Sequence, residues 1–278
     1  SEMCIRDRIY LSVIVVPVFY SFFISLFDWN GIGEMKFQGL GNYVALFTQD
    51  KVFPIALKNN LIWILLTVVL TTTVSLALAL LLNNKFHGRT FFRAFFYFPS
   101  VIALIAVAII WRWVYDPTMG FINQFFKALG IPFAQSWISA PKVSLYVVFF
   151  AALWQAVGQP MILFLAGLQS VSADVLEAAT IDGAGPVKKF FYVTFPLMKE
   201  TFVIVLATLI VAAMKVFDII QGLTGGGPNN STETMATYMY SQTFRYNNVG
   251  TGTAVACVMV LMMMVVIVPY IAFTAKDD

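Results

Sequence analysis

The chain has 278 residues, of which 60% are hydrophobic and only 11% are charged. A soluble globular domain is typically about 45–50% apolar and about 25% charged, so lipid rather than water is expected to cover much of the surface. The net charge of +3 is small and scattered, which gives no indication of nucleic-acid binding. Two distant cysteines and one histidine provide no metal-ligand spacing, so we expect no metal site.

Residues 1–8 are charged and meet the first apolar run abruptly, and the chain does not begin with methionine. We therefore expect them to be a non-native or truncated remnant. The apolar run that follows has a basic N-terminal flank, which would also fit a cleaved signal peptide. Asp28 and Trp29 after the run favour a membrane anchor instead. We assign residues 9–56 to a first transmembrane helix with its outer connector, and residues 57–275 to the remaining transmembrane domain.

Six apolar runs predict an all-α membrane protein with six transmembrane helices. A helix needs roughly 20 apolar residues, at about 1.5 Å of rise each, to cross a hydrocarbon core about 30 Å thick. Six segments reach this length, with approximate bounds 9–27, 61–82, 95–115, 143–168, 202–220 and 253–273. They fill the chain from end to end, which favours a single membrane domain.

The distribution of lysine and arginine predicts which side of the membrane each connector faces. Basic residues crowd the connectors after the second and fourth spans, whereas those of the opposite connectors are spread over longer loops. The crowded residues are Lys85, Arg89, Arg93, Lys188, Lys189 and Lys199. Because cytoplasmic connectors carry an excess of such residues, we expect both termini and the connector after the fourth span to be cytoplasmic.

The connector between the fourth and fifth spans predicts a short helix, a turn and a second helix. Ser172 can cap the first helix, and Gly183 can end it in a left-handed conformation. Pro186 suits the first turn of the second helix, which should continue until Pro196 breaks it. Spacing alone leaves two interpretations open: an elbow that only redirects the chain, or an exposed helix that docks to a soluble partner.

The same connector resembles the signature of the inner-membrane permeases of binding-protein-dependent ABC importers. That signature is Glu-Ala-Ala, three residues, Gly, nine residues and Ile-x-Leu-Pro. This chain matches its spacing from Glu177 to Pro196, with Val193 and Phe195 in place of Ile and Leu. The resemblance implies the type I ABC importer permease fold, with six transmembrane helices and a cytoplasmic coupling helix. It also implies that a partner ATPase contacts Glu177, Ala178, Ala179, Asp182, Gly183 and Ala184.

Further segments resemble the carbohydrate-uptake branch of this family, and in particular the first of the two dissimilar permeases of maltose-type and glycerol-phosphate-type systems. Two of them follow the fourth connector: Lys215-Val216-Phe217-Asp218 and the stretch 223–234. Asp28-Trp29-Asn30, after the first span, fits the same branch. The resemblance covers nearly the whole chain from residue 9.

The resemblance implies a permease subunit of an ATP-driven sugar importer in the inner membrane of a bacterium or archaeon. It would work by alternating access with a second, non-identical permease, a cytoplasmic ATPase dimer and a periplasmic or lipid-anchored solute-binding protein. The chain itself would be no enzyme and would bind no cofactor, because ATP and Mg²⁺ belong to the ATPase. It contains no Gly-Lys dipeptide from which a phosphate-binding loop could be built. Glycerol phosphate or another small polar solute, an ion-coupled secondary carrier and a membrane enzyme are the alternatives.

Four residues within the spans are candidates for the translocation path. Lys215 and Asp218 lie three apart on one face of the fifth span, where they either line the path or form a structural pair. Trp154 and Gln155 in the fourth span suit a sugar, which offers C–H faces and hydroxyls, although a tryptophan in a membrane helix more often packs. The outer loop Gly225-Gly226-Gly227-Pro228 is either a contact for the binding protein or gate, or a flexible turn.

Overall fold

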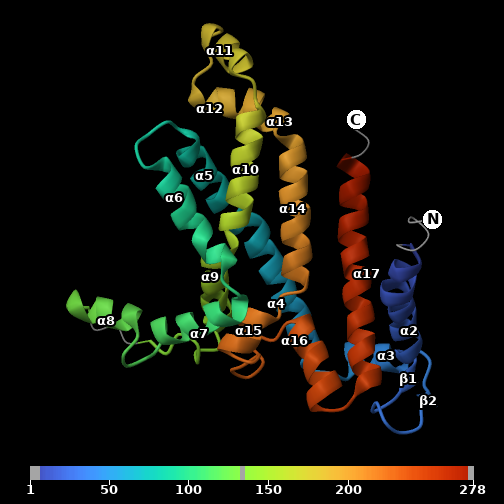
Figure 1. Cartoon of the computed structure of the whole chain (residues 1–278). Coiled ribbons are helices and arrows are strands. Elements are labelled where there is room, and N and C mark those ends of the chain that lie inside the picture. The colour runs from blue at the N-terminus through green and yellow to red at the C-terminus, as the bar shows by residue number, and fades with distance from the viewer. Residues whose placement is uncertain (1–6, 132–134, 275–278) are drawn as a thin grey trace.

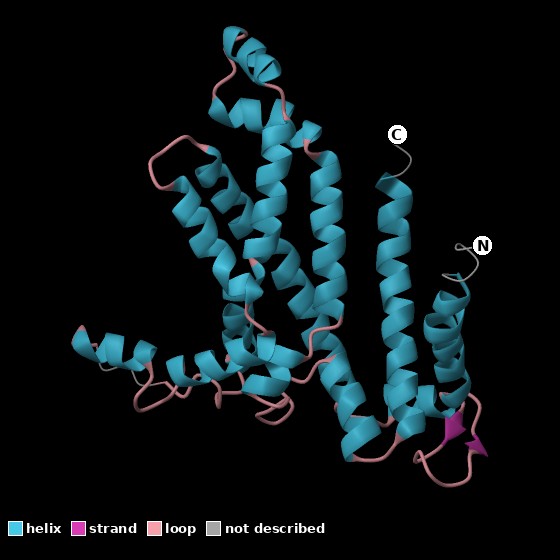
Figure 2. Ribbon diagram, viewed as in Figure 1, coloured by secondary structure: helices cyan, strands magenta, loops and turns pink. Residues whose placement is uncertain are grey.

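The computed structural model describes residues 7–131 and 135–274 and is almost entirely helical (Figures 1 and 2). By length and composition, three helices could each span a membrane, and six spans result if each of three bent helix pairs counts as one. The prediction of an all-α membrane fold is confirmed. The third and fifth spans differ in detail from their predicted bounds: the third is sharply bent, and the fifth ends early.

The first helix runs Asp7–Ile24 and includes α2 (Val16–Ile24). It packs against α17 (Val249–Thr274) and stands apart from the other long helices (Figure 1). The helix ends before the predicted residue 27 because β1 (Phe27–Asp28) begins there and pairs antiparallel with β2 (Lys36–Phe37). The short helix α3 (Gly41–Thr48) follows this hairpin.

The second span is one helix of 31 residues, made of α4 (Phe53–Leu66), a π-helical turn and α5 (Thr72–Asn83). At about 1.5 Å per residue it is about 46 Å long, and it extends beyond a hydrocarbon core about 30 Å thick. It starts earlier than the predicted residue 61. Hydropathy does not indicate this earlier start because Asn59 and Asn60 are polar, although both are buried in the structure.

The predicted third span, 95–115, is broken into two helices that meet at a sharp bend. α6 (Arg89–Tyr97) continues through a 3₁₀ turn, and α7 (Leu104–Val114) then departs at an angle of 101°. Pro99 in the 3₁₀ turn lacks the N–H that an α-helix needs, and the two residues before α7 are extended. α7 and α8 (Phe121–Ala128) therefore lie across one end of the bundle (Figure 1). Because α7 is as apolar as a transmembrane helix, its composition does not show that it turns away from α6.

The fourth span consists of α9 (Ser144–Ala156) and α10 (Gly158–Ser170), which meet at a bend of 46°. Its bounds agree closely with the predicted 143–168. Gly158 lies at the bend, where a Cβ would come 3.0 Å from the carbonyl oxygen of Phe96. The glycine therefore permits close packing of the fourth span against the end of α6.

The predicted fifth span, 202–220, ends early. α14 (Lys199–Met214) stops before the two apolar residues that precede α15 (Asp218–Leu223). The chain continues through α16 (Met235–Tyr240) and a π-helical stretch into α17, which contains the whole of the predicted sixth span. Lys215 and Asp218 flank the break after α14, but two charged residues in a long apolar run do not show a break in its hydropathy.

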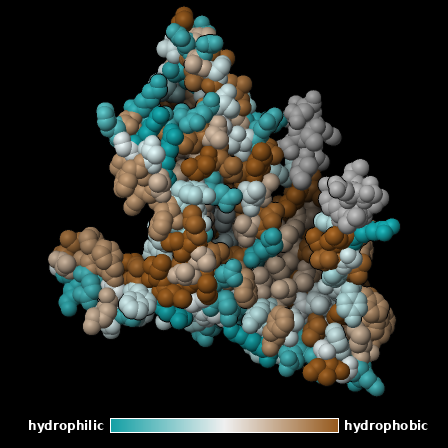
Figure 3. Space-filling view, viewed as in Figure 1, coloured by the Kyte–Doolittle hydropathy of each residue, from teal (hydrophilic) through white to brown (hydrophobic). Residues whose placement is uncertain are grey.

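The apolar core of the described residues forms three clusters, one of which joins α3, α4, α16 and α17 around Phe53 and Met235. A second joins α4, α9 and α15 around Trp63 and Ile220, and the third joins α10 and α14 around Phe164. Many large apolar side chains on α2, α6 and α17 are exposed. In Figure 3, hydrophobic side chains predominate between the two more hydrophilic ends of the molecule. Such a surface is covered by lipid or by another subunit.

Candidate functional site

The polar connector after the fourth span forms a helical hook, defined here as residues 172–197. Its helices α11 (Ala173–Ile181) and α12 (Pro186–Lys189) stand beyond the ends of α10 and α14 (Figure 1). The Ser172 hydroxyl accepts a hydrogen bond from a backbone N–H of the first turn at 3.4 Å, and Gly183 has a φ of +79°. The predicted helix, its serine cap and its glycine stop are confirmed.

The second helix of the hook continues slightly past its predicted end. It begins at Pro186 and runs through the short segment α13 (Phe195–Leu197) before a bend of 74° leads into α14. Pro196 lies in the first turn of α13, where a missing N–H is tolerated. The prediction that Pro196 ends the helix is therefore wrong by one residue.

The surface of the hook is open to another protein. None of the nine residues of α11 is buried, and Ile181 at its end is 82% exposed. Lys189 Nζ donates a hydrogen bond to Thr180 Oγ1 at 3.0 Å, which joins α12 to α11. All the predicted contact residues are exposed or half-buried on this surface: Glu177, Ala178, Ala179, Asp182, Gly183 and Ala184. Exposed apolar side chains beside charged ones are typical of a protein-binding surface.

A cavity of about 160 Å³, here named the polar cavity, opens between α4, α9, α14 and the start of α15. Gln155, Lys215 and Asp218 line it together with Thr67 and Thr71. The structure thus brings together three of the four residues predicted for the path. Lys215 and Asp218 do not share a helical face, contrary to the prediction, because α14 ends between them. Lys215 caps α14, and Asp218 starts α15.

Gln155 connects the polar cavity to the sharp bend between α6 and α7. Its Nε2 donates to the carbonyl oxygens of Ser100 at 3.4 Å and Ile102 at 3.3 Å. These carbonyls lie where the helix is interrupted and its own hydrogen bonds end. Thr71 Oγ1 is buried and has no hydrogen-bond partner within the described residues. The cavity wall therefore offers amide, hydroxyl, ammonium and carboxylate groups to a polar solute.

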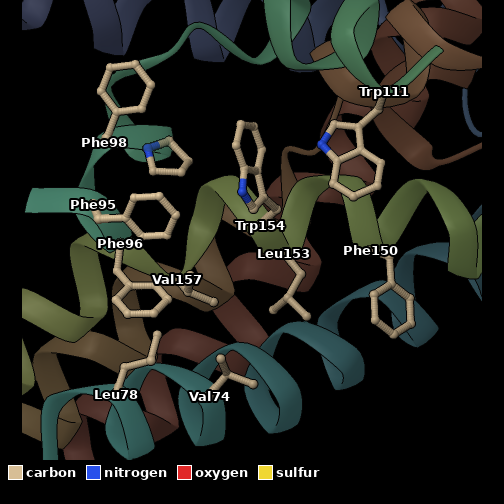
Figure 4. Close-up of a pocket in the computed structure, with 11 residues that line it drawn as sticks. Val74, Leu78, Phe95, Phe96, Phe98, Trp111, Phe150, Leu153, Trp154 and Val157 are labelled. Carbon is tan, nitrogen blue, oxygen red and sulfur yellow. The ribbon is translucent and has the colours of Figure 1, made fainter. Parts of the chain in front are cut away.

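Trp154 lies in a second, apolar cavity of about 470 Å³, here named the aromatic cavity (Figure 4). Its ring meets the ring of Trp111 edge-on at a centroid distance of 6.1 Å. Apart from these two indoles, the side chains that line the cavity carry no polar atoms. Leu153 borders both cavities, so the structure separates Trp154 from Gln155 although they are adjacent in the sequence.

The glycine loop, residues 225–228, is closely packed. Gly225 and Gly226 have φ values of +60° and +91°, which favour glycine. A Cβ on Gly226 would lie 1.9 Å from Oε2 of Glu233. The Thr232 hydroxyl donates to a carbonyl oxygen of the loop at 2.8 Å. These contacts hold the three glycines in one ordered conformation.

Sequence reasoning missed the buried polar residues that anchor this loop. Asn59 Nδ2 on α4 donates to the carbonyl oxygens of Ser231 at 3.0 Å and Glu233 at 2.9 Å. The Glu233 side chain is 6% exposed, and burial raises its pKa against the opposing effects of Thr237 and Arg245. Its Oε1 has no hydrogen-bond partner in the part of the chain that the structure describes. The feature of the sequence that could have indicated this anchor is the pair of adjacent asparagines, Asn59 and Asn60, directly before an apolar run.

Comparisons with known proteins identify the family. Residues 72–275 match the sequence model described as binding-protein-dependent transport system inner membrane component. The chain is 36% identical to a probable ABC transporter permease of Pyrococcus horikoshii, over 94% of this chain and 90% of that protein. It is also 36% identical to the multiple sugar-binding transport system permease MsmF of Streptococcus mutans, over 86% and 81% of the two chains.

This chain superposes with a TM-score of 0.86 on a chain in the solved structure of a bacterial ABC transporter involved in the import of the acidic polysaccharide alginate. The two chains are 20% identical, and the match covers 99% of this chain and 94% of that one. At this identity the similarity bears on the fold alone. Together, the helical bundle with its hook and the matches over most of the chain show that it belongs to the family of binding-protein-dependent transport system inner membrane components.

Proposed function

We propose that the chain is a permease subunit of an ATP-driven sugar importer, in which the hook couples a partner ATPase to the polar cavity. The observation that carries this proposal is the continuity between the two sites. α9 carries Gln155 and leads through α10 into the hook, and α14 leads from the hook to Lys215. With 16 residues, α14 is about 24 Å long, so one helix can transmit a displacement of the hook to the cavity wall.

The lining of the polar cavity supports a hydroxylated solute. Gln155, Lys215 and Asp218 supply the donors and acceptors that sugar hydroxyls need, and the Streptococcus mutans relative is named for sugar transport. Trp154 lies outside the polar cavity, in the aromatic cavity that shares Leu153 with it. The cavity of about 160 Å³ is smaller than ordinary ligand sites of about 300–1,000 Å³. Because Lys215 and Asp218 are exposed at its mouth, a second, non-identical permease would complete it.

In the proposed assembly the hook and both termini lie on the cytoplasmic side. This orientation follows from the basic residues of the hook and of the α5–α6 turn, because cytoplasmic connectors carry an excess of lysine and arginine. There an ATPase dimer, which binds ATP and Mg²⁺, covers Glu177 and its neighbours. The solute-binding protein docks at the opposite end, beside the glycine loop. Closure of the ATPase dimer then pulls the two hooks of the paired permeases together and opens the path outward, which is alternating access.

Charge reversal at Glu177 tests the coupling role. E177K changes an exposed residue of α11 and should leave the bundle folded. An unfavourable charge in an interface costs several kcal/mol, so copurification of the ATPase and ATP-dependent sugar uptake should each fall at least about tenfold. E200K is the matched control, because Glu200 is an exposed glutamate at the start of α14, outside the hook.

Two results would count against this function. Normal copurification and uptake in E177K would refute the coupling role of the hook. Uptake that survives ATP depletion but collapses with the ion gradient would instead indicate an ion-coupled carrier.

A further inference from the structure

The turn between α5 and α6 lies at the hook end of the molecule (Figure 1). This turn carries a cationic pocket. Lys85, Phe86, His87 and Arg89 line a cavity of about 340 Å³, here named the basic pocket. Within the described residues, no carboxylate forms an ion pair with Lys85 or Arg89. Arg93 links α6 to α5 across the turn, because its Nη2 donates a hydrogen bond to the carbonyl oxygen of Leu82 at 2.8 Å. The pocket is therefore positively charged and lacks a counter-ion of its own.

A row of phenylalanine rings leads from the basic pocket along α6. Phe86 of the pocket meets Phe92 at a ring-centroid distance of 6.0 Å. Phe91 meets Phe92 at 5.7 Å and stacks with Phe95 at 6.3 Å. Phe95 in turn lines the aromatic cavity (Figure 4). Phe91 and Phe95 are 67% and 60% exposed, so the row lies on the surface and joins the two cavities.

The dimensions of α6 match one leaflet of a bilayer. Phe98, at the aromatic cavity, follows Arg89 by nine residues, which corresponds to about 14 Å of helix rise. Half of a hydrocarbon core is about 15 Å thick. The phosphate groups lie several Å outside that core, so when the basic pocket lies at their depth, the aromatic cavity lies deep among the acyl chains of the same leaflet.

We propose that the basic pocket, the phenylalanine row and the aromatic cavity form one binding site for an anionic phospholipid. Lys85, His87 and Arg89 hold the phosphate, and an acyl chain follows the phenyl rings into the aromatic cavity beside Trp111 and Trp154. Basic residues beside a transmembrane helix attract anionic lipids. A free phosphate would leave the phenyl rings uncovered, and a sugar would find no partners for its hydroxyls among them. The three cations of the site line neither the polar cavity nor the hook.

Lipid titration of the full chain, purified in detergent and delipidated, tests the headgroup part. Native mass spectrometry would compare phosphatidylglycerol with phosphatidylcholine of identical acyl chains, each with and without inorganic phosphate. One cation near an anionic headgroup contributes about fivefold in affinity, so K85Q/R89Q should bind phosphatidylglycerol about 25-fold more weakly. K188Q/K189Q, which removes two cations from the hook at the same end, should bind it like the unchanged protein.

Tryptophan fluorescence tests the acyl-chain part. At one lipid per protein, phosphatidylglycerol with brominated chains should quench the fluorescence of the unchanged protein, and W111F/W154F should lose most of that quenching. The proposal is overturned if the two lipids bind equally, or if K85Q/R89Q retains full affinity. It is also overturned if phosphate displaces the lipid at equal concentration, which would reveal a simple anion site, or if the brominated chains leave the fluorescence unchanged.

Discussion

Replacing Gly226 by alanine should destabilise the protein through a clash inside the glycine loop. The added Cβ would lie 1.9 Å from Oε2 of Glu233, whose side chain is only 6% exposed and has little room to move aside. Overpacking of this kind costs about 1–3 kcal/mol. The φ of +91° adds about 1–2 kcal/mol for a residue with a side chain. The free energy of unfolding should therefore fall by about 2–5 kcal/mol.

Gly225 provides a matched control, because its φ is +60° but a Cβ there meets no atom within 4 Å. G225A should cost only the backbone part, about 1–2 kcal/mol. Thermal unfolding in detergent changes by about 2–4 °C per kcal/mol for chains of about this size, so G226A should melt about 2–12 °C below G225A. In an E233A background, G226A should cost less than in the unchanged protein. Equal melting temperatures for G225A and G226A would refute the argument from packing.

Three other predictions concern polar groups that are buried (Asn59, Glu233) or half-buried (Gln155). Asn59→Leu should cost about 2–4 kcal/mol in thermal unfolding, because two carbonyl oxygens lose a donor at 2.9 and 3.0 Å; an unchanged melting temperature would contradict the anchoring role. Burial raises the pKa of Glu233 above its ordinary 4.5, so the folded state holds this proton more tightly than the unfolded state. Stability should therefore decline as the pH rises from about 4.5 through the folded pKa, and melting curves of E233Q should lack that decline. Gln155→Leu should cost about 1 kcal/mol and lower sugar uptake, since its bonds at 3.3 and 3.4 Å are long; Q159L on the same span should be neutral in both assays.

Hydropathy located the spans but could not show their bends. The run 95–115 is continuous in composition, yet Pro99 removes a backbone donor and the chain turns by 101°. The run 202–220 conceals the end of α14 in the same way. The hook was predictable almost to the residue because Ser172 and Gly183 act locally, through a cap and a left-handed stop.

The candidate site was predictable only in part, because cavities depend on contacts between distant segments. Adjacent residues on a helix do not face each other, so Trp154 and Gln155 belong to different cavities. The hydrogen bond between Asn59 and the Glu233 backbone joins positions 174 residues apart, so no local sequence pattern predicts it. The motif residues of the hook needed no such long-range information.

Leu153 is one side chain thick, and at that point it is the whole partition between the polar and the aromatic cavities. A leucine has only a few staggered rotamers, so a rotation that widens one compartment narrows the other. A lipid chain in the aromatic cavity would restrict the Leu153 side chain to one rotamer. Without that chain, Leu153 would be free to change rotamer. The proposed lipid site and the proposed solute path therefore share the Leu153 side chain.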